Sequence, residues 1–132
     1  MARLLCTSSF RESLKLLTKR PNLGYSACAD DIRHDFSKKS LDDIYGQHYL
    51  VTQRGQARII KARIKNPLLN TGAAGGYRVI FICNLKRSHA ALLTVYPKKG
   101  KYSKTDLTEA EYRELLQTYI EEIDSLEVFL DE

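Results

Sequence analysis

Residues 77–96, YRVIFICNLKRSHAALLTVY, decide the fold because they hold two apolar runs joined by a short polar segment. The runs YRVIFIC (77–83) and AALLTVY (90–96) have the length and composition of buried strands. The segment NLKRSH (84–89) between them is typical of a turn. This stretch therefore predicts a central β-hairpin whose two strands are both buried.

Helical patterns precede the hairpin. ARLLCT (2–7) can form a short first strand, and SSFRESLKLLTKRP (8–21) predicts a helix with Ser8 or Ser9 as N-cap and Glu12 as capping-box partner. A second helix is expected over YSACADDIRHDFSKK (25–39). The positions expected to face inward on it are Ala29, Ile32 and Phe36. The following segment, LDDIYGQHYLVTQRGQ (41–56), is ambiguous, although its Tyr, Leu and Val content favours extended structure.

A last helix is expected after Thr108, which is a suitable N-cap, with Glu111 at the capping-box position. The order of elements predicts one α+β domain over residues 1–132 with two layers. Its parts are a helical N-terminal region (1–40), a small antiparallel sheet with a basic loop (56–105) and an acidic C-terminal helix (106–132). We expect the N-terminal helices to pack on the sheet and the C-terminal helix to lie behind it.

Charge is unevenly distributed along the 132 residues. The net charge is +5, yet residues 109–132 hold nine acidic side chains against one arginine, which gives −8 there and +13 for residues 1–108. A basic body of this kind indicates a surface for polyanions. The acidic end is either a solvated helix or a partial screen for the basic face.

Several classes of function find no support in the sequence. Cys6, Cys28 and Cys83 form no CxxC pair and have no histidine at ligand spacing, so neither a disulfide framework nor a metal site is expected, and a reducing, cytoplasmic setting is favoured. No apolar run approaches the length of a membrane span, so no membrane partner is expected. Nucleotide-binding glycine loops, HExxH and nucleophile elbows are also missing, and His48 is the only histidine considered for proton transfer.

The basic residues fall in three segments that a small sheet would bring together. In RIIKARIK (58–65), strand alternation puts Lys61, Arg63 and Lys65 on one face, opposite three apolar residues. The segment YPKKGKYSKT (96–105) interleaves cations with tyrosines, a pattern typical of RNA-binding surfaces. Its candidate residues are Lys98, Lys99, Lys101, Tyr102 and Lys104. A half-exposed strand and a solvated loop would explain the same charges without a ligand.

Arg78 stands at the start of an apolar strand, where an unpaired charge is unfavourable, so it needs a carboxylate or an anionic ligand. Gly72, Gly75 and Gly76 precede it. They either leave room for a ligand to approach the strand or form a merely flexible connection.

Two stretches, GGYRVIFIC (75–83) and ALLTVYPKKGKYSKTDLTEAEYRELL (91–116), resemble the C-terminal half of RelE-type toxins of the HigB-like branch. There a glycine pair introduces an arginine-bearing strand, and a later strand runs into a lysine-rich loop before the last helix. The opening MARLLCTSSF (1–10) is similar as well. The resemblance implies a RelE-like fold and the toxin of a type II toxin–antitoxin system, with a cognate antitoxin, the ribosome and mRNA as partners.

The activity implied by the resemblance is ribosome-dependent cleavage of mRNA without a metal or other cofactor, in which the 2′-hydroxyl attacks the adjacent phosphate. By position, Lys61 and Arg63 resemble residues acting as base or phosphate ligands, and Arg78 resembles a phosphate clamp. Lys98 or Lys99 matches the cation after the last strand, and Tyr102 is a candidate for stacking or proton donation. The residues expected to bind RNA beside them are Lys65, Lys99, Lys101 and Lys104.

Two features depart from that family's pattern: the longer 40–57 segment and Pro97. They leave the choice among Lys98, Lys99 and Lys101 open. Two other functions also stay open, a ParE-like inhibitor of DNA gyrase and a RelE-fold protein that binds its partners without cleaving RNA.

Overall fold

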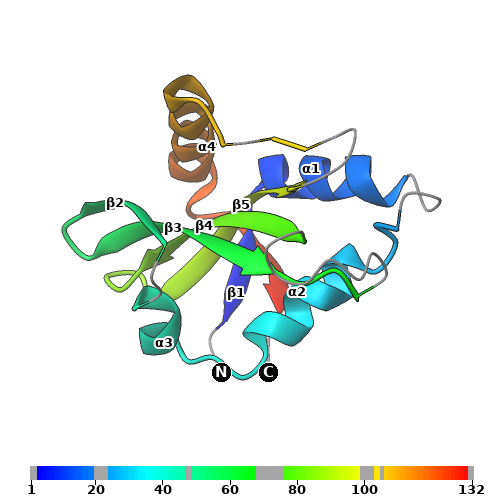
Figure 1. The fold of residues 1–132 in the computed structure, drawn as a ribbon. Helices are drawn as coiled ribbons and strands as arrows, with labels where there is room; N and C mark the ends of the chain where they lie inside the picture. Colours follow the sequence, from blue (N-terminus) through cyan, green and yellow to red (C-terminus); the bar gives the residue numbers. More distant parts are fainter. Residues whose placement is uncertain are drawn as a thin grey trace.

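A computed structural model of the protein describes residues 3–19, 24–46, 49–67, 76–98, 103–104 and 106–130. Within these ranges the chain forms four helices and one six-stranded sheet with strand order β2-β3-β4-β5-β1-β6 (Figure 1). In chain order the elements are β1 (Leu4–Cys6), α1 (Ser8–Thr18), α2 (Cys28–Phe36), α3 (Leu41–Tyr45), β2 (Leu50–Arg54), β3 (Ala57–Ile64), β4 (Tyr77–Asn84), β5 (His89–Pro97), α4 (Glu109–Glu122) and β6 (Glu127–Leu130). This arrangement agrees with the expected α+β class.

The central hairpin is confirmed. β4 and β5 pair antiparallel from Asn84 opposite His89 to Tyr77 opposite Pro97, and residues 77–83 are all buried. In the turn, Ser88 takes a left-handed backbone conformation with φ 54°. The pairing shifts by one residue between Ile80 and Phe81 because Leu93 is an extra residue on β5.

The sheet is not purely antiparallel, so the sequence-based expectation was wrong on this point. β1 pairs parallel with β5, and β6 then pairs antiparallel with β1 at the edge of the sheet. β1 has only three residues, and its apolar pattern carries no information about the direction of its partner. The expected acidic helix over 106–132 in fact ends at Glu122, and residues 127–130 form the edge strand β6.

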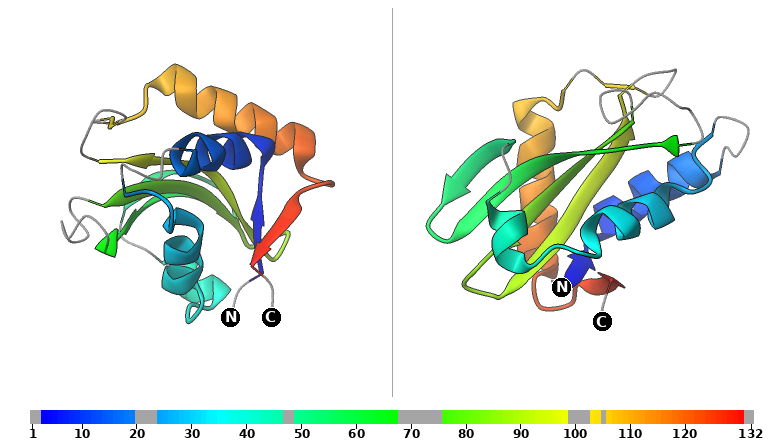
Figure 2. Two further views of the ribbon diagram at one scale, coloured as in Figure 1. Left: turned by 90° about the vertical axis from the view of Figure 1, so that its right-hand side faces the viewer. Right: turned by 60° about the horizontal axis from the view of Figure 1, so that its bottom comes forward.

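Helices cover both faces of the sheet, which corrects the expected two-layer arrangement. α2 and α3 lie on one face, and α4 lies on the other (Figure 2, left). Strand alternation produces two separate apolar clusters from the same strands. On the α2–α3 face, the β4 side chains are Tyr77, Val79, Phe81 and Cys83. On the α4 face, Ile80 and Ile82 pack with Tyr119 of α4.

α1 lies beside β5, where the short β1 leaves the edge of β5 uncovered. The hydroxyl of Ser9 donates to the Leu93 carbonyl at 3.0 Å, and the Val95 amide donates to the Ser13 hydroxyl at 3.1 Å. Serine side chains of the helix thus satisfy backbone groups that a neighbouring strand would otherwise pair. The N-cap of this helix is Thr7, whose Oγ1 accepts from the Phe10 amide at 3.3 Å, and not Ser8 or Ser9 as expected.

Residues 41–56 form a helix followed by a strand, so the expectation of extended structure was correct only for the second half of this segment. Ser40 and Asp43 form a reciprocal capping box that starts α3, and Gly46 ends it. β2 follows at Leu50–Arg54 with every residue exposed. The second helix is shorter than predicted, and Cys28 takes the buried position expected for Ala29, which is half-buried.

The last helix begins as predicted. Thr108 and Glu111 form a reciprocal capping box, with the Glu111 amide donating to Thr108 Oγ1 at 3.1 Å. At the other end of α4, a Glu122 carboxylate oxygen accepts from the Ser8 amide at 2.8 Å, and the second oxygen accepts from the Ser8 hydroxyl. The last turn of α4 therefore caps the first turn of α1.

Candidate nucleic-acid interface

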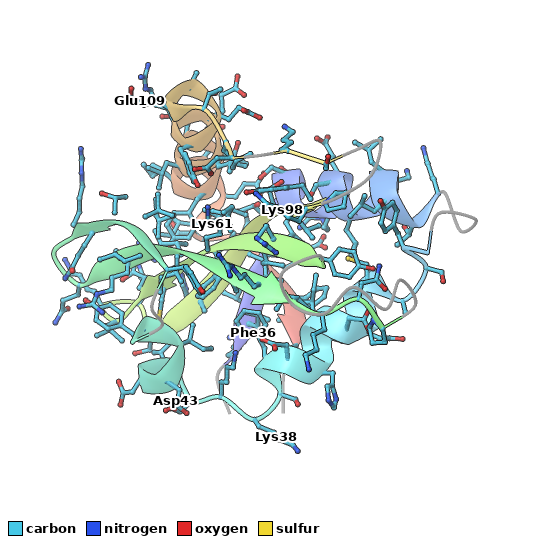
Figure 3. The ribbon with its side chains drawn as sticks, viewed as in Figure 1. Phe36, Lys38, Asp43, Lys61, Lys98 and Glu109 are labelled. Atoms are coloured by element: carbon cyan, nitrogen blue, oxygen red, sulfur yellow. The ribbon has the colours of Figure 1, made fainter. Side chains whose placement is uncertain are left out.

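The predicted alternation along β3 is confirmed. Ile60, Ala62 and Ile64 are buried on the α2–α3 face, while Lys61 and Arg63 lie on the α4 face. Lys65 is exposed and follows directly after the end of the strand. Figure 3 shows the side chain of Lys61 on the same side of the sheet as Lys98, whereas Phe36 lies on the opposite side.

Strand register brings three polar residues into one row across the α4 face. Arg63 on β3 is opposite Arg78 on β4, and Arg78 is opposite Tyr96 on β5. We call Arg63, Arg78 and Tyr96 the cationic row. Directly opposed residues in antiparallel strands have their Cβ atoms about 5 Å apart. The row therefore brings two positive charges close together on one face of the sheet.

Arg78 is 4% exposed. Its Nη1 atom donates to the Tyr77 carbonyl at 3.3 Å. Burial lowers the pKa of Arg78, and the positive charge of Arg63 lowers it further. Both effects oppose a positive charge at this point.

Tyr96 is the residue that the sequence did not identify. Its side chain is 5% exposed, and among the described residues its hydroxyl has no hydrogen-bond partner. Burial raises the pKa of Tyr96 to about 12, with a further increase from Asp106 and an opposing effect from Arg78. Because a buried hydroxyl without a partner is unfavourable, this hydroxyl is ready to bond to a ligand.

Two lysines near the cationic row already pair with acidic residues at the start of α4. Lys61 Nζ lies 3.6 Å from Asp106 Oδ1, and Lys104 Nζ lies 2.6 Å from Glu111 Oε2. These pairs are partly or largely exposed, and such pairs contribute little to stability, so a phosphate can replace the carboxylate at low cost. The Lys104 pair and the Thr108 amide lower the pKa of Glu111.

The backbone of Gly76, just before β4, contacts the end of β3 on one side and the end of β5 on the other. Its carbonyl accepts from the Lys98 amide at 2.9 Å, which extends the pairing of β4 with β5 by one step. A Cβ atom on Gly76 would lie 2.0 Å from the Ile64 carbonyl oxygen, so the close approach of the chain segments requires glycine here. Gly76 thus serves strand packing. Gly72 and Gly75 lie outside the described residues, as do the predicted site residues Lys99, Lys101 and Tyr102.

Arg63 and the histidines lie in different surroundings. Arg63 stacks over the ring of Tyr49 with 4.6 Å between the guanidinium carbon and the ring centroid. His89 is buried and shares a 2.6 Å hydrogen bond with the Tyr119 hydroxyl. His34 is exposed, and His48 lies outside the described residues. Within the described ranges, no group of three or more His, Cys, Asp or Glu side chains is placed to hold a metal ion.

Comparison of the chain with protein-family models, with curated proteins and with solved structures gives no match. None of the helices in the described part of the chain is long and apolar enough to cross a membrane. The described structure is a sheet with helices on both faces, and the α4 face carries the cationic row.

Proposed function

We propose that the protein is the toxin of a type II toxin–antitoxin system with a RelE-like fold and that it cleaves mRNA on the ribosome, in the cytoplasm. The reaction is a metal-independent attack of the 2′-hydroxyl on the adjacent phosphate, which leaves a cyclic phosphate or 3′-phosphate and a 5′-hydroxyl end. The observation that carries the proposal is the cationic row, in which two arginines and an unpartnered tyrosine hydroxyl share one face of the sheet.

Each residue of the row suits one requirement of this reaction. The charge that develops on the phosphorane needs fixed cations in a place of limited water access, and Arg78 is such a cation. Arg63 is exposed and stacks on Tyr49, so it can hold the phosphate at the outer end of the row. Lys61 and Lys98 flank the row on the same side and supply further charge for the RNA backbone.

Tyr96 is assigned the role of proton donor. A tyrosine whose pKa is raised to about 12 remains protonated at neutral pH, so its hydroxyl donates a hydrogen bond and does not act as a base. Positioned next to Arg78 in the row, it can donate to a phosphate oxygen or to the leaving 5′ oxygen. This is the role that was expected for Tyr102, which lies outside the described residues. Lys61 is kept as a phosphate ligand.

The antitoxin follows from the same charges. A protein that carries a row of cations on an open sheet face is blocked most directly by a partner that covers them with carboxylates. We therefore propose a cognate antitoxin that places an acidic segment over the row. Within the chain, carboxylates already pair with lysines near the row, in Lys61–Asp106 and Lys104–Glu111.

The test is to induce the protein in bacterial cells and to map new 5′ ends on translated and untranslated copies of one mRNA. We expect 5′-hydroxyl ends on the translated copy alone, with loss of these ends in Tyr96→Phe and Arg63→Gln. Tyr77→Phe is the matched control, because Tyr77 is also a buried tyrosine of the hairpin but lies on the α2–α3 face. This variant should cleave like the wild type.

Three results would contradict the proposal in different ways. Equal cleavage by wild type and Tyr96→Phe would remove Tyr96 from the mechanism. Growth arrest with intact mRNA would favour an inhibitor of DNA gyrase. Absence of any effect on growth or mRNA, in cells that contain the folded protein, would favour a binding module without catalysis.

A further inference from the structure

A groove separate from the cationic row lies between α1, the end of β5 and α4. It encloses about 650 Å³ and meets the row only at Tyr96. The apolar residues that line it are Leu16, Leu17, Val95, Pro97, Leu107 and Leu115. Leu16, on the α1 side, is 64% exposed, which is unusual for a leucine beside a concave apolar surface.

The groove is acidic at its rim. Glu111 and Glu114 of α4 and Glu12 of α1 line it, while Lys104 is the single cation among its described lining residues. Lys104 is itself paired with Glu111 at 2.6 Å, which leaves the charges of Glu12 and Glu114 uncompensated within the groove lining. Among its described lining residues, carboxylates therefore outnumber cations, whereas the described cationic row holds two arginines.

The opposite side of α4 provides a comparison. There a second cavity of about 550 Å³ between α4 and β2 is lined by Glu109, Arg113 and Arg54, among others. Arg113 Nη2 lies 4.0 Å from Glu109 Oε1, so the charges on this side are balanced within the helix. The excess of carboxylates is thus a property of the α1 side of the helix.

The two helices that form the walls of the groove are joined where α4 ends and α1 begins. Glu122 at the end of α4 accepts from the Ser8 amide at the start of α1 at 2.8 Å, and Ser9 and Ser13 fasten α1 to β5. α4 has 14 residues and is thus about 21 Å long. The α4 residues that line the groove lie between Glu111 and Thr118, which is about 11 Å of helix. An apolar groove between two helices suits a short amphipathic helix that inserts aliphatic side chains at helical spacing.

We propose that this groove binds a short amphipathic helix of a partner protein, with aliphatic residues on its buried face and Lys or Arg on its flanks. The cations of the helix would face Glu12 and Glu114, and its aliphatic residues would cover Leu16. Nucleic acid is a poor occupant, because its phosphates would lie against these carboxylates. The proposal does not depend on mRNA cleavage, since carboxylates outnumber cations in the described lining of the groove, whereas the cationic row holds two arginines.

The experiment is a selection of helical peptides from a random display library on the immobilised full-length protein. We expect the selected peptides to carry a net positive charge and aliphatic residues at i, i+3, i+4 and i+7. Binding of one selected peptide is then measured by fluorescence anisotropy to protein variants. Glu114→Lys should weaken binding by about tenfold or more, because it reverses a charge inside the groove.

Glu109→Lys is the matched control, since Glu109 is an exposed glutamate of the same helix that lines the cavity on the other side. It should leave affinity within about twofold, as expected for a charge outside the binding surface. Circular dichroism verifies that both variants fold. Selected peptides that are acidic or neutral, or that bind Glu114→Lys as well as wild type, would overturn the proposal. A wild-type dimer in sedimentation that Leu16→Glu converts to a monomer would also overturn it, because the occupant would then be a second copy of this chain.

Discussion

The two faces of the sheet are built from the same strands, yet they differ in how completely they are covered. On the α2–α3 face, successive inward residues of β3 and β4 are apolar and buried, and two aromatic rings, Phe36 and Phe81, meet edge to face at 5.3 Å. On the α4 face, Ile80 and Ile82 are buried beneath the helix, but the strand positions beyond them hold Arg63, Arg78 and Tyr96, of which only Arg63 is exposed. One face is apolar throughout, and the other combines an apolar core with the polar row of the candidate site.

The largest loss of stability is expected when a buried aromatic ring is removed from the α2–α3 face. Phe81→Ala deletes a fully buried ring on the α2–α3 face, and we expect the free energy of unfolding to fall by about 3–5 kcal/mol. Urea denaturation followed by circular dichroism measures this change. A decrease below about 1 kcal/mol would show that this face is not the main core.

The stability of the protein should depend on pH through His89, which packs against Tyr119 of α4. Burial lowers the pKa of His89, and the charges of Arg87 and Arg3 lower it further, so the unfolded chain binds a proton more readily than the folded one. Stability is therefore full above the unfolded pKa of about 6.5 and falls as the pH decreases through it, by at most about 1.4 kcal/mol per pH unit.

Urea midpoints at pH 7.5 and pH 5.5 test this expectation, since the carboxylates whose pKa is lowered titrate below this window. His89→Asn should remove most of the pH dependence. The matched control is His34→Asn, because His34 is exposed on α2. A slope that persists in His89→Asn would assign the effect to another group.

Removal of the Tyr96 hydroxyl should not destabilise the protein. Tyr96→Phe removes a buried group that has no partner among the described residues, so stability should stay the same or rise by about 1 kcal/mol. Thermal unfolding of the wild type and Tyr96→Phe measures this. A loss of more than about 1 kcal/mol would mean that the hydroxyl is bonded in the folded protein and contributes to its stability.

The smallest effect is expected for an ion pair at the edge of the site. Lys104→Gln removes an exposed pair with Glu111, so the free energy of unfolding should change by less than about 0.5 kcal/mol. Unfolding at low and high salt checks this, and the already small difference should vanish at high salt. A larger change would indicate that Lys104 has a structural role beyond the pair.

The elements that could be predicted from sequence depend on neighbours in the chain. The hairpin, the alternation of β3 and the capping box of Thr108 and Glu111 are all local patterns, and the structure confirms them. The parallel pairing of β1 and the edge strand β6 depend on contacts between distant segments, and no local pattern specifies them.

Tyr96 is the residue of the candidate site that local sequence patterns could not predict. Counting outward from Asn84 opposite His89 in an unbroken hairpin would put Val95 opposite Arg78. The extra residue Leu93 shifts the register, so that Tyr96 takes this place beside Arg78. Apolar composition identifies β5 as a strand but does not reveal a bulge within it, and Tyr96 was therefore missed.

The anchoring of α4 at one end has a consequence for its motion. Near its C-terminal end, Tyr119 is buried against His89, and Glu122 binds the backbone of Ser8. Near its N-terminal end, the contacts to the rest of the chain include the exposed pair Lys104–Glu111. Local opening begins where few buried contacts must break. Amide hydrogen exchange along α4 should therefore be fastest in the turn after Thr108 and slowest around Tyr119, so that the helix opens first at the end nearest Lys61.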